Sequence, residues 1–98
     1  MKINVIANDT QVEVTSKEKQ IIHIAILNIL VLLNAIITKQ GMVSNPIDDD
    51  LNNLGYEVHF EKDLTIEEKN EFTRRVQNQI GTFLAMSDIA YVVDIEKR

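Results

Sequence analysis

Apolar and polar side chains alternate along Lys2–Ala7, which is the pattern of a β-strand with one buried face. The dipeptide Asn8–Asp9 tolerates positive φ, and Thr10–Val14 alternates again. These features predict a β-hairpin at the start of the chain.

The segment Ile21–Thr38 is apolar almost all the way round, because fourteen of its eighteen residues are apolar. A surface helix of a small domain shows an apolar stripe on one side only. Thr15–Glu18 has the form of a capping box that opens a helix, and Gly41 is placed to end that helix near Gln40. The sequence therefore predicts one long helix whose surface the chain alone does not cover.

The length of this helix predicts assembly. From Ser16 to Gln40 it would measure about 37 Å, whereas a six-residue strand spans about 20 Å. The helix is expected to overhang its own sheet with apolar surface, which predicts a homo-oligomer, in its simplest form a dimer, with helix packed on helix across a two-fold axis. The predicted interface residues are His23, Leu27, Leu30, Asn34 and Ile37.

The second half of the chain predicts two helices and a strand. Asn45–Pro46 with the following acids and Gly55 has the form of a short capped helix. Tyr56–Lys62 alternates as a strand. Thr65–Glu68 is a second capping box, and the residues after it have the spacing of an amphipathic helix.

The last third of the chain predicts one close contact between helices and leaves two interpretations of its final segment. Gly81 is expected to let its helix approach Ala25 or Ala35 of the first helix closely. Ile89–Ile95 is rich in β-branched and aromatic residues and indicates a final strand, with a helix continued to the C-terminus as the alternative.

These elements predict an α+β domain spanning residues 1–98, in the order β-β-α-(short α)-β-α-β. The simplest architecture is a four-stranded, mainly antiparallel sheet with both long helices on its apolar face. The polar face is expected to display Asn4, Gln11, Glu13, Glu57, His59 and Glu61.

Composition narrows the class of protein. The chain has 45% hydrophobic and 26% charged residues, as folded globular domains do. It has no cysteine, which excludes disulfides, thiolate zinc sites and cysteine nucleophiles. The N-terminus lacks the apolar core of a secretory signal. A membrane span at 21–38 is disfavoured by two asparagines and a histidine, so a cytoplasmic protein is expected.

Charge is concentrated in one part of the chain. The net charge is −5, and residues 45–71 hold nine acids against two lysines. This distribution disfavours direct nucleic-acid binding and predicts an acidic surface that docks on a basic protein partner. The acids are Asp48, Asp49, Asp50, Glu57, Glu61, Asp63, Glu67, Glu68 and Glu71.

His59 is a candidate metal ligand or general base. His59 lies between Glu57 and Glu61 at a spacing of two, so the three share one strand face, where Glu13 and Asp94 could join them. Such a cluster can bind a metal or act as a general base, but it is also what a solvated sheet face looks like, and we favour that interpretation. The acids from Asp48 onward fail the spacing of a calcium loop.

Two further groups have competing interpretations. His23, Asn34 and Thr38 lie within about 60° on a helical wheel. They either line a ligand pocket between subunits or form the hydrogen bonds that set a helix register, and we favour the second. Arg74–Arg75 could hold a phosphate, but we expect them to pair with Glu71 or Asp88 in solvent.

The common catalytic signatures, from glycine-rich phosphate loops to G-x-S-x-G, have no counterpart in the chain. The leading hypothesis is therefore a non-enzymatic binding protein without cofactor or metal, of the kind that a phage or mobile element uses to inhibit a nucleic-acid-binding protein. The alternatives are an oligomer that binds a small molecule or nucleotide between subunits and a metal-assisted enzyme centred on His59.

Overall fold

The computed structural model describes residues 1–7, 15–50, 53–86 and 91–96. The elements are β1 (Lys2–Ala7), α1 (Ser16–Leu33), the π-helical turn η1 (Asn34–Thr38), β2 (Met42–Asp50), β3 (Asn53–Phe60), α2 (Ile66–Ala85) and β4 (Tyr91–Glu96).

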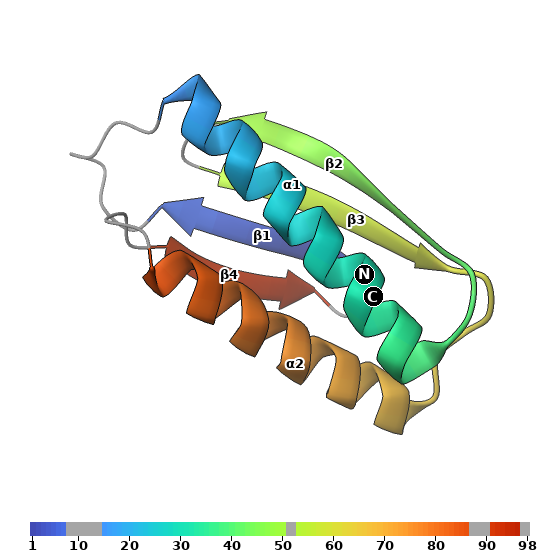
Figure 1. The fold of residues 1–98 in the computed structure, drawn as a ribbon. Helices are drawn as coiled ribbons and strands as arrows, with labels where there is room; N and C mark the ends of the chain where they lie inside the picture. The colour runs from blue at the N-terminus through green and yellow to red at the C-terminus, as the bar shows by residue number, and fades with distance from the viewer. Residues whose placement is uncertain (8–14, 51–52, 87–90, 97–98) are drawn as a thin grey trace.

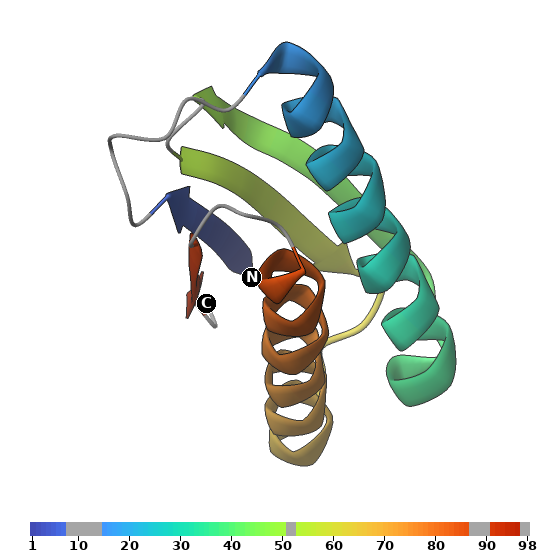
Figure 2. The same ribbon diagram turned by 60° about the vertical axis from the view of Figure 1, so that its left-hand side comes forward.

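The strands form one sheet in the order β2-β3-β1-β4, in which every neighbouring pair is antiparallel. Both helices cover the same face of this sheet (Figure 1 and Figure 2). The described order β-α-β-β-α-β with this strand order is the split βαβ, or ferredoxin-like, arrangement. The α+β class, the four-stranded antiparallel sheet and the two long helices are thus confirmed.

One predicted element is wrong. The segment predicted as a short helix from Asn45 forms the edge strand β2, which pairs with β3 from Met42↔Phe60 to Asp50↔Asn53. The local helix signals are overridden because pairing with β3 satisfies the backbone. Pro46 fits because a proline is tolerated in an edge strand or beside a bulge, and the register shifts between Pro46 and Asp48. The predicted strand Thr10–Val14 lies outside the described residues.

The first helix also ends differently from the prediction. It passes into η1 and stops at Lys39, which adopts the left-handed conformation (φ 54°) and donates its backbone N–H to the Asn34 carbonyl at 2.8 Å. None of the three glycines, all of which the structure describes, has positive φ, so Gly41 is not the terminating residue.

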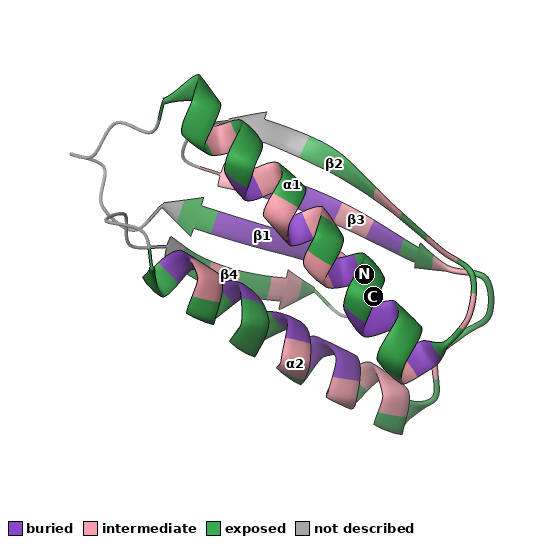
Figure 3. Ribbon diagram, viewed as in Figure 1, coloured by how far each residue is buried: buried purple, intermediate pink, exposed green. Residues whose placement is uncertain are grey.

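The core lies between the sheet and the two helices. Buried residues recur along α1 and α2, which Figure 3 shows as purple segments of both helices. His23 of α1 meets Tyr56 of β3, and Phe72 of α2 packs edge-on against Phe60 at 5.3 Å between ring centroids. The fully enclosed residues are Ile3, Val5, Ile26, Leu30, Leu54, Tyr56, Val58, Phe72, Val76 and Ile80.

β4 is a strand, as predicted, and not a continuation of α2. It pairs with β1 along its full length, from Ala7↔Tyr91 to Lys2↔Glu96. Gly81, however, does not approach α1. It is exposed, and a Cβ placed there would meet nothing within 4 Å.

The length mismatch between helix and sheet is smaller than expected. β2 and β3 hold nine and eight residues, so the longer strand spans about 30 Å. The apolar surface that stays uncovered therefore lies along the side of α1 and not beyond the end of the sheet.

Ser16–Thr38 has the length and composition of a membrane-crossing helix, and 28% of its most apolar window is buried within the fold. Length and composition alone do not separate such a helix from one that packs in a protein core.

Candidate functional site

The sheet face opposite the helices carries most of the polar residues of the strands. Tyr56 points toward α1, so the alternate residues of β3 point to the other face. We call that other face the open face. By strand register it holds Lys2, Asn4, Ile6, Val43, Asn45, Glu57, His59, Val92, Asp94 and Glu96.

The open face includes three of the predicted polar residues, namely Asn4, Glu57 and His59. Asn4 is buried, while His59 is exposed. Glu61 follows the end of β3, and Gln11 and Glu13 lie outside the described residues.

His59 and Glu57 form a surface pair. Nε2 of His59 lies 3.2 Å from Oε1 of Glu57, with 63% and 44% of the two side chains exposed. Asp94 is in register with Asn4, and Asn4 with Gly55, so Asp94 lies two strands away from β3. Across the described residues no three His, Asp or Glu side chains are placed to hold a metal ion. The geometry is that of a solvated sheet face.

The polar residues of α1 and η1 are bonded within the chain. His23 Nδ1 lies 2.7 Å from the Tyr56 hydroxyl. Thr38 Oγ1 donates to the Asn34 carbonyl at 3.2 Å and also to the Asn34 side-chain oxygen, while Asn34 Nδ2 donates to the Gln40 carbonyl at 2.8 Å. All of these contacts lie within one copy of the chain, with Tyr56 of β3 and Gln40 as the partners beyond α1 and η1.

The arginine pair is engaged by a carboxylate, as expected. Arg74 Nη2 lies 2.9 Å from Glu71 Oε2, and Arg75 Nη1 lies 3.9 Å from Glu71 Oε1. The hydrogen bond from Arg74 lowers the pKa of Glu71 below its ordinary value of 4.5, and the charges of both arginines act in the same direction. Asp88, the other expected partner, lies outside the described residues.

The predicted acidic surface is not one patch. β2 and β3 run antiparallel, so 48–50 lie at one end of the sheet, while Glu61, Asp63, Glu67 and Glu68 lie at the other. The eight residues of β3 separate these ends by about 23 Å, well beyond the screening length of about 8 Å at physiological salt. Glu57 lies on the open face, Glu68 caps α2, and Glu71 pairs with arginine. The side chains of Asp48, Asp49 and Asp50 lie outside the described residues.

The predicted interface residues mostly face the interior of the protein's own fold. Leu30 is fully buried, Asn34 is buried, and His23, Leu27 and Ile37 are half-buried. The exposed side of the helix is the opposite one. We call it the outer stripe, and its members are Ile21, Ile24, Asn28, Val31, Leu32, Ala35 and Ile36.

The outer stripe is apolar apart from Asn28. Its five large aliphatic side chains are 47–62% exposed, and Figure 3 shows this exposed surface alternating with the buried line along α1. The sequence did not identify this face because the segment is apolar on every side, so a helical wheel gives no preferred inner face. The spacing of its members was the only available signal.

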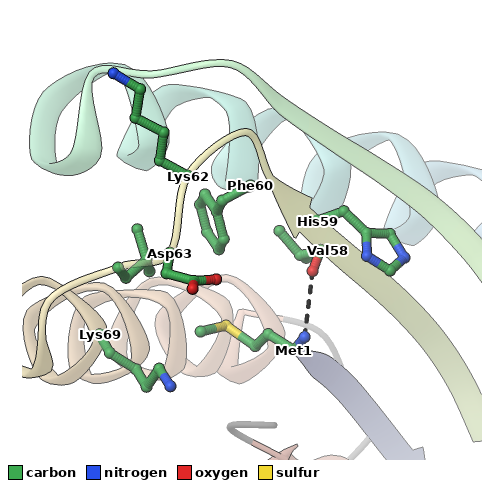
Figure 4. A pocket seen from close by; sticks show the side chains of 8 residues that line it. Met1, Val58, His59, Phe60, Lys62, Asp63 and Lys69 are labelled. Carbon is green, nitrogen blue, oxygen red and sulfur yellow. Dashed lines mark hydrogen bonds between the residues drawn. The ribbon is translucent and has the colours of Figure 1, made fainter.

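A hollow of about 450 Å³ lies between the end of β3 and α2. Phe60 and Leu64 line it together with Asp63, Lys62 and Lys69. Figure 4 shows the Lys62 and Lys69 ammonium groups far apart, with the Asp63 carboxylate between them and the Met1 amine donating to the Val58 carbonyl at 3.2 Å. The cations therefore do not converge on a common anion.

No protein-family model, curated protein or solved structure matches this chain.

Proposed function

We propose that the protein is a non-enzymatic binding protein that acts as a homodimer joined through the outer stripe of α1. The single observation that carries this proposal is the exposure of Ile21, Ile24, Val31, Leu32 and Ile36 on one side of a helix whose other side is core. Soluble monomers rarely leave a contiguous apolar surface of this kind uncovered, and such surfaces mark interaction sites.

The physical driving force is burial of aliphatic surface. Removing apolar surface from water contributes about 25 cal/mol per Å², and the stripe has no charge to desolvate between Ile21 and Ile36. Light scattering across a concentration range tests the dimer. We expect the mass to move from 11.2 kDa toward twice that value.

Matched variants separate the stripe from general surface hydrophobicity. Ile24→Glu combined with Val31→Glu should leave a folded monomer, because association would bury two carboxylates per copy. Ile66→Glu is the control, since Ile66 is 80% exposed and lies at the start of α2. A monomeric wild type, or loss of the dimer in the Ile66→Glu control, contradicts the proposal.

A second binding surface is proposed for the open face, where a basic protein partner would dock. The support is the balance of charge on this face. Among the side chains that the structure describes there, three are acidic, Glu57, Asp94 and Glu96, and Lys2 is basic. The proposal of a phage or mobile-element inhibitor rests on this surface and on the net charge of −5. Cytoplasmic action is part of the same proposal.

The test is capture from the native host with identification by mass spectrometry. Glu57→Lys with Asp94→Lys should abolish capture of the partner, because complementary charge steers such complexes. Glu67→Lys is the control, since Glu67 lies at the end of the sheet and outside the open face. A partner retained by the open-face variant, or lost equally in the control, overturns this part.

Neither alternative from the sequence gains support from a described contact. The groups proposed to hold a small molecule, His23, Asn34, Arg74 and Arg75, are bonded within the chain. His59 has one carboxylate beside it and is exposed.

A further inference from the structure

We propose that Asn28 faces Asn28 of a second copy of this chain across a two-fold axis, and that this amide pair fixes the register of the dimer. The inference rests on the proposed dimer and adds the geometry of its centre and the residue that positions it.

The outer stripe contains the spacing of a helix-pairing seam. Ile21, Ile24, Asn28, Val31 and Ala35 follow one another at intervals of three, four, three and four residues, which is the a/d repeat of helices that pack along their length. All five side chains are exposed on the same side of the helix. The repeat therefore lies on the surface, where a second helix can reach it.

Asn28 is the only polar member of the outer stripe and lies at its midpoint, since the stripe runs from Ile21 to Ile36. A two-fold pairing that covers the whole stripe places its midpoint against the same residue of the other copy, whether the helices run parallel or antiparallel. An asparagine side chain both donates and accepts hydrogen bonds, so two copies satisfy one another. An aliphatic partner would leave the amide buried without a bond.

The size of the stripe matches the footprint of one helix on another. It extends about 22 Å along α1 and the start of η1 and is one helix face wide, and helices pack at about 8–10 Å between their axes. This contact is smaller than the roughly 800 Å² per partner of a standard interface. We therefore expect a weak dimer whose population depends on concentration.

The face opposite the outer stripe favours a second copy over a lipid surface as the occupant. An interfacial helix needs a charged face opposite its apolar face, whereas the face opposite the outer stripe holds the core residues Ile22, Ile26, Leu30 and Leu33.

Cysteine crosslinking tests the register directly, because the chain contains no cysteine. Under mild oxidation Asn28→Cys should form a disulfide-linked dimer. The bond requires the two Cα atoms to lie within about 7 Å of one another, and the proposed register brings the two copies of residue 28 face to face. Asn78→Cys is the matched control, since Asn78 is an exposed asparagine of α2. A wild-type dimer with no crosslink at Asn28 overturns the register and leaves the proposed dimer standing, whereas a wild-type monomer by light scattering overturns the dimer itself.

A charge variant tests the amide pair in solution. Asn28→Asp should raise the dimer dissociation constant at least about tenfold at pH 7, because two carboxylates would face one another. The affinity should recover as the pH falls to about 4, where one of the two carboxyls takes up a proton. Asn78→Asp should change neither value, and circular dichroism checks that both variants stay folded. Equal affinity of Asn28→Asp and wild type at pH 7 contradicts the proposal.

Asn28→Leu provides an independent readout of register. A single polar residue in a seam specifies one oligomeric state at a cost in stability. We therefore expect tighter association with a mixture of stoichiometries. A single dimeric species with unchanged affinity would show that Asn28 does not position the pair.

Discussion

The Tyr56 hydroxyl lies 2.7 Å from Nδ1 of His23, and the two rings meet edge to face with centroids 5.3 Å apart. This contact joins the middle of β3 to the inner face of α1. It is one of the contacts that hold this side of the apolar helix against the sheet, while the opposite side remains outside.

Removing the hydroxyl should weaken this attachment. We expect Tyr56→Phe to lower the free energy of unfolding by about 1 kcal/mol, the usual contribution of a partly buried hydrogen bond. A double-mutant cycle with His23→Ala should give a coupling of similar size. Chemical denaturation of the four proteins measures it, and additive effects would mean that the two side chains contribute independently.

The end of η1 has a conformational cost that a glycine would remove. Lys39 adopts φ 54°, a region that disfavours residues with a Cβ by about 1 kcal/mol. Lys39→Gly should therefore stabilise the fold by about that amount, whereas Lys39→Ala keeps the Cβ and should not. Thermal unfolding compares the two, and equal melting temperatures would contradict the role of the left-handed turn.

Gly81 gives the opposite case within α2. An exposed glycine inside a helix is less favourable than alanine by roughly 1 kcal/mol, and a Cβ at Gly81 meets nothing within 4 Å. Gly81→Ala should raise the free energy of unfolding by about 0.5–1 kcal/mol. A loss of stability on denaturation would show that the glycine is needed for a close contact.

Glu71 should report the arginine pair through its titration. Its pKa is lowered, first by the hydrogen bond from Arg74, so the charged carboxylate is favoured in the folded state. The resulting stabilisation is present above about pH 4.5 and is lost as the pH falls through the lowered pKa. In Arg74→Ala the carboxyl should titrate closer to 4.5, as NMR can measure. An unchanged midpoint would contradict the assignment.

The two proposed binding surfaces should respond to salt in opposite ways. Two copies of net charge −5 repel, and screening that repulsion should tighten the dimer by about two- to fivefold between roughly 50 and 500 mM salt. Binding of a basic partner to the open face should weaken over the same range. Sedimentation measures the first and a binding isotherm the second. A dimer that weakens with salt would indicate attraction between charges in place of apolar burial.

Local signals were enough to predict three strands and two helices. Thr65 and Glu68 form the capping box that their spacing predicted, with the Glu68 N–H donating to Thr65 Oγ1 at 3.1 Å and the Thr65 N–H to Glu68 Oε1 at 3.1 Å. β1 and β3 follow from alternation, since one buried face imposes a period of two on a strand. These features depend on residues that are close together in the chain, so the sequence alone is enough to predict them.

Local signals failed at Asn45–Pro46. They have the form of a helix start, yet the segment pairs with β3, because a backbone that finds a strand partner satisfies its hydrogen bonds without a helix. The residues around Pro46 do not by themselves indicate that this segment pairs with β3.

Residue order alone is enough to show that 21–38 is an apolar helix with more hydrophobic surface than a small domain covers. Which side of that helix faces the sheet depends on packing in three dimensions. The segment is apolar all round, so both orientations bury similar side chains, and the choice rests on contacts with residues far along the chain, such as His23 with Tyr56. Those contacts turn Leu30 and Asn34 inward and leave Ile24, Asn28 and Val31 outside. For this reason the proposed assembly keeps the helix that the sequence predicted but uses its other face.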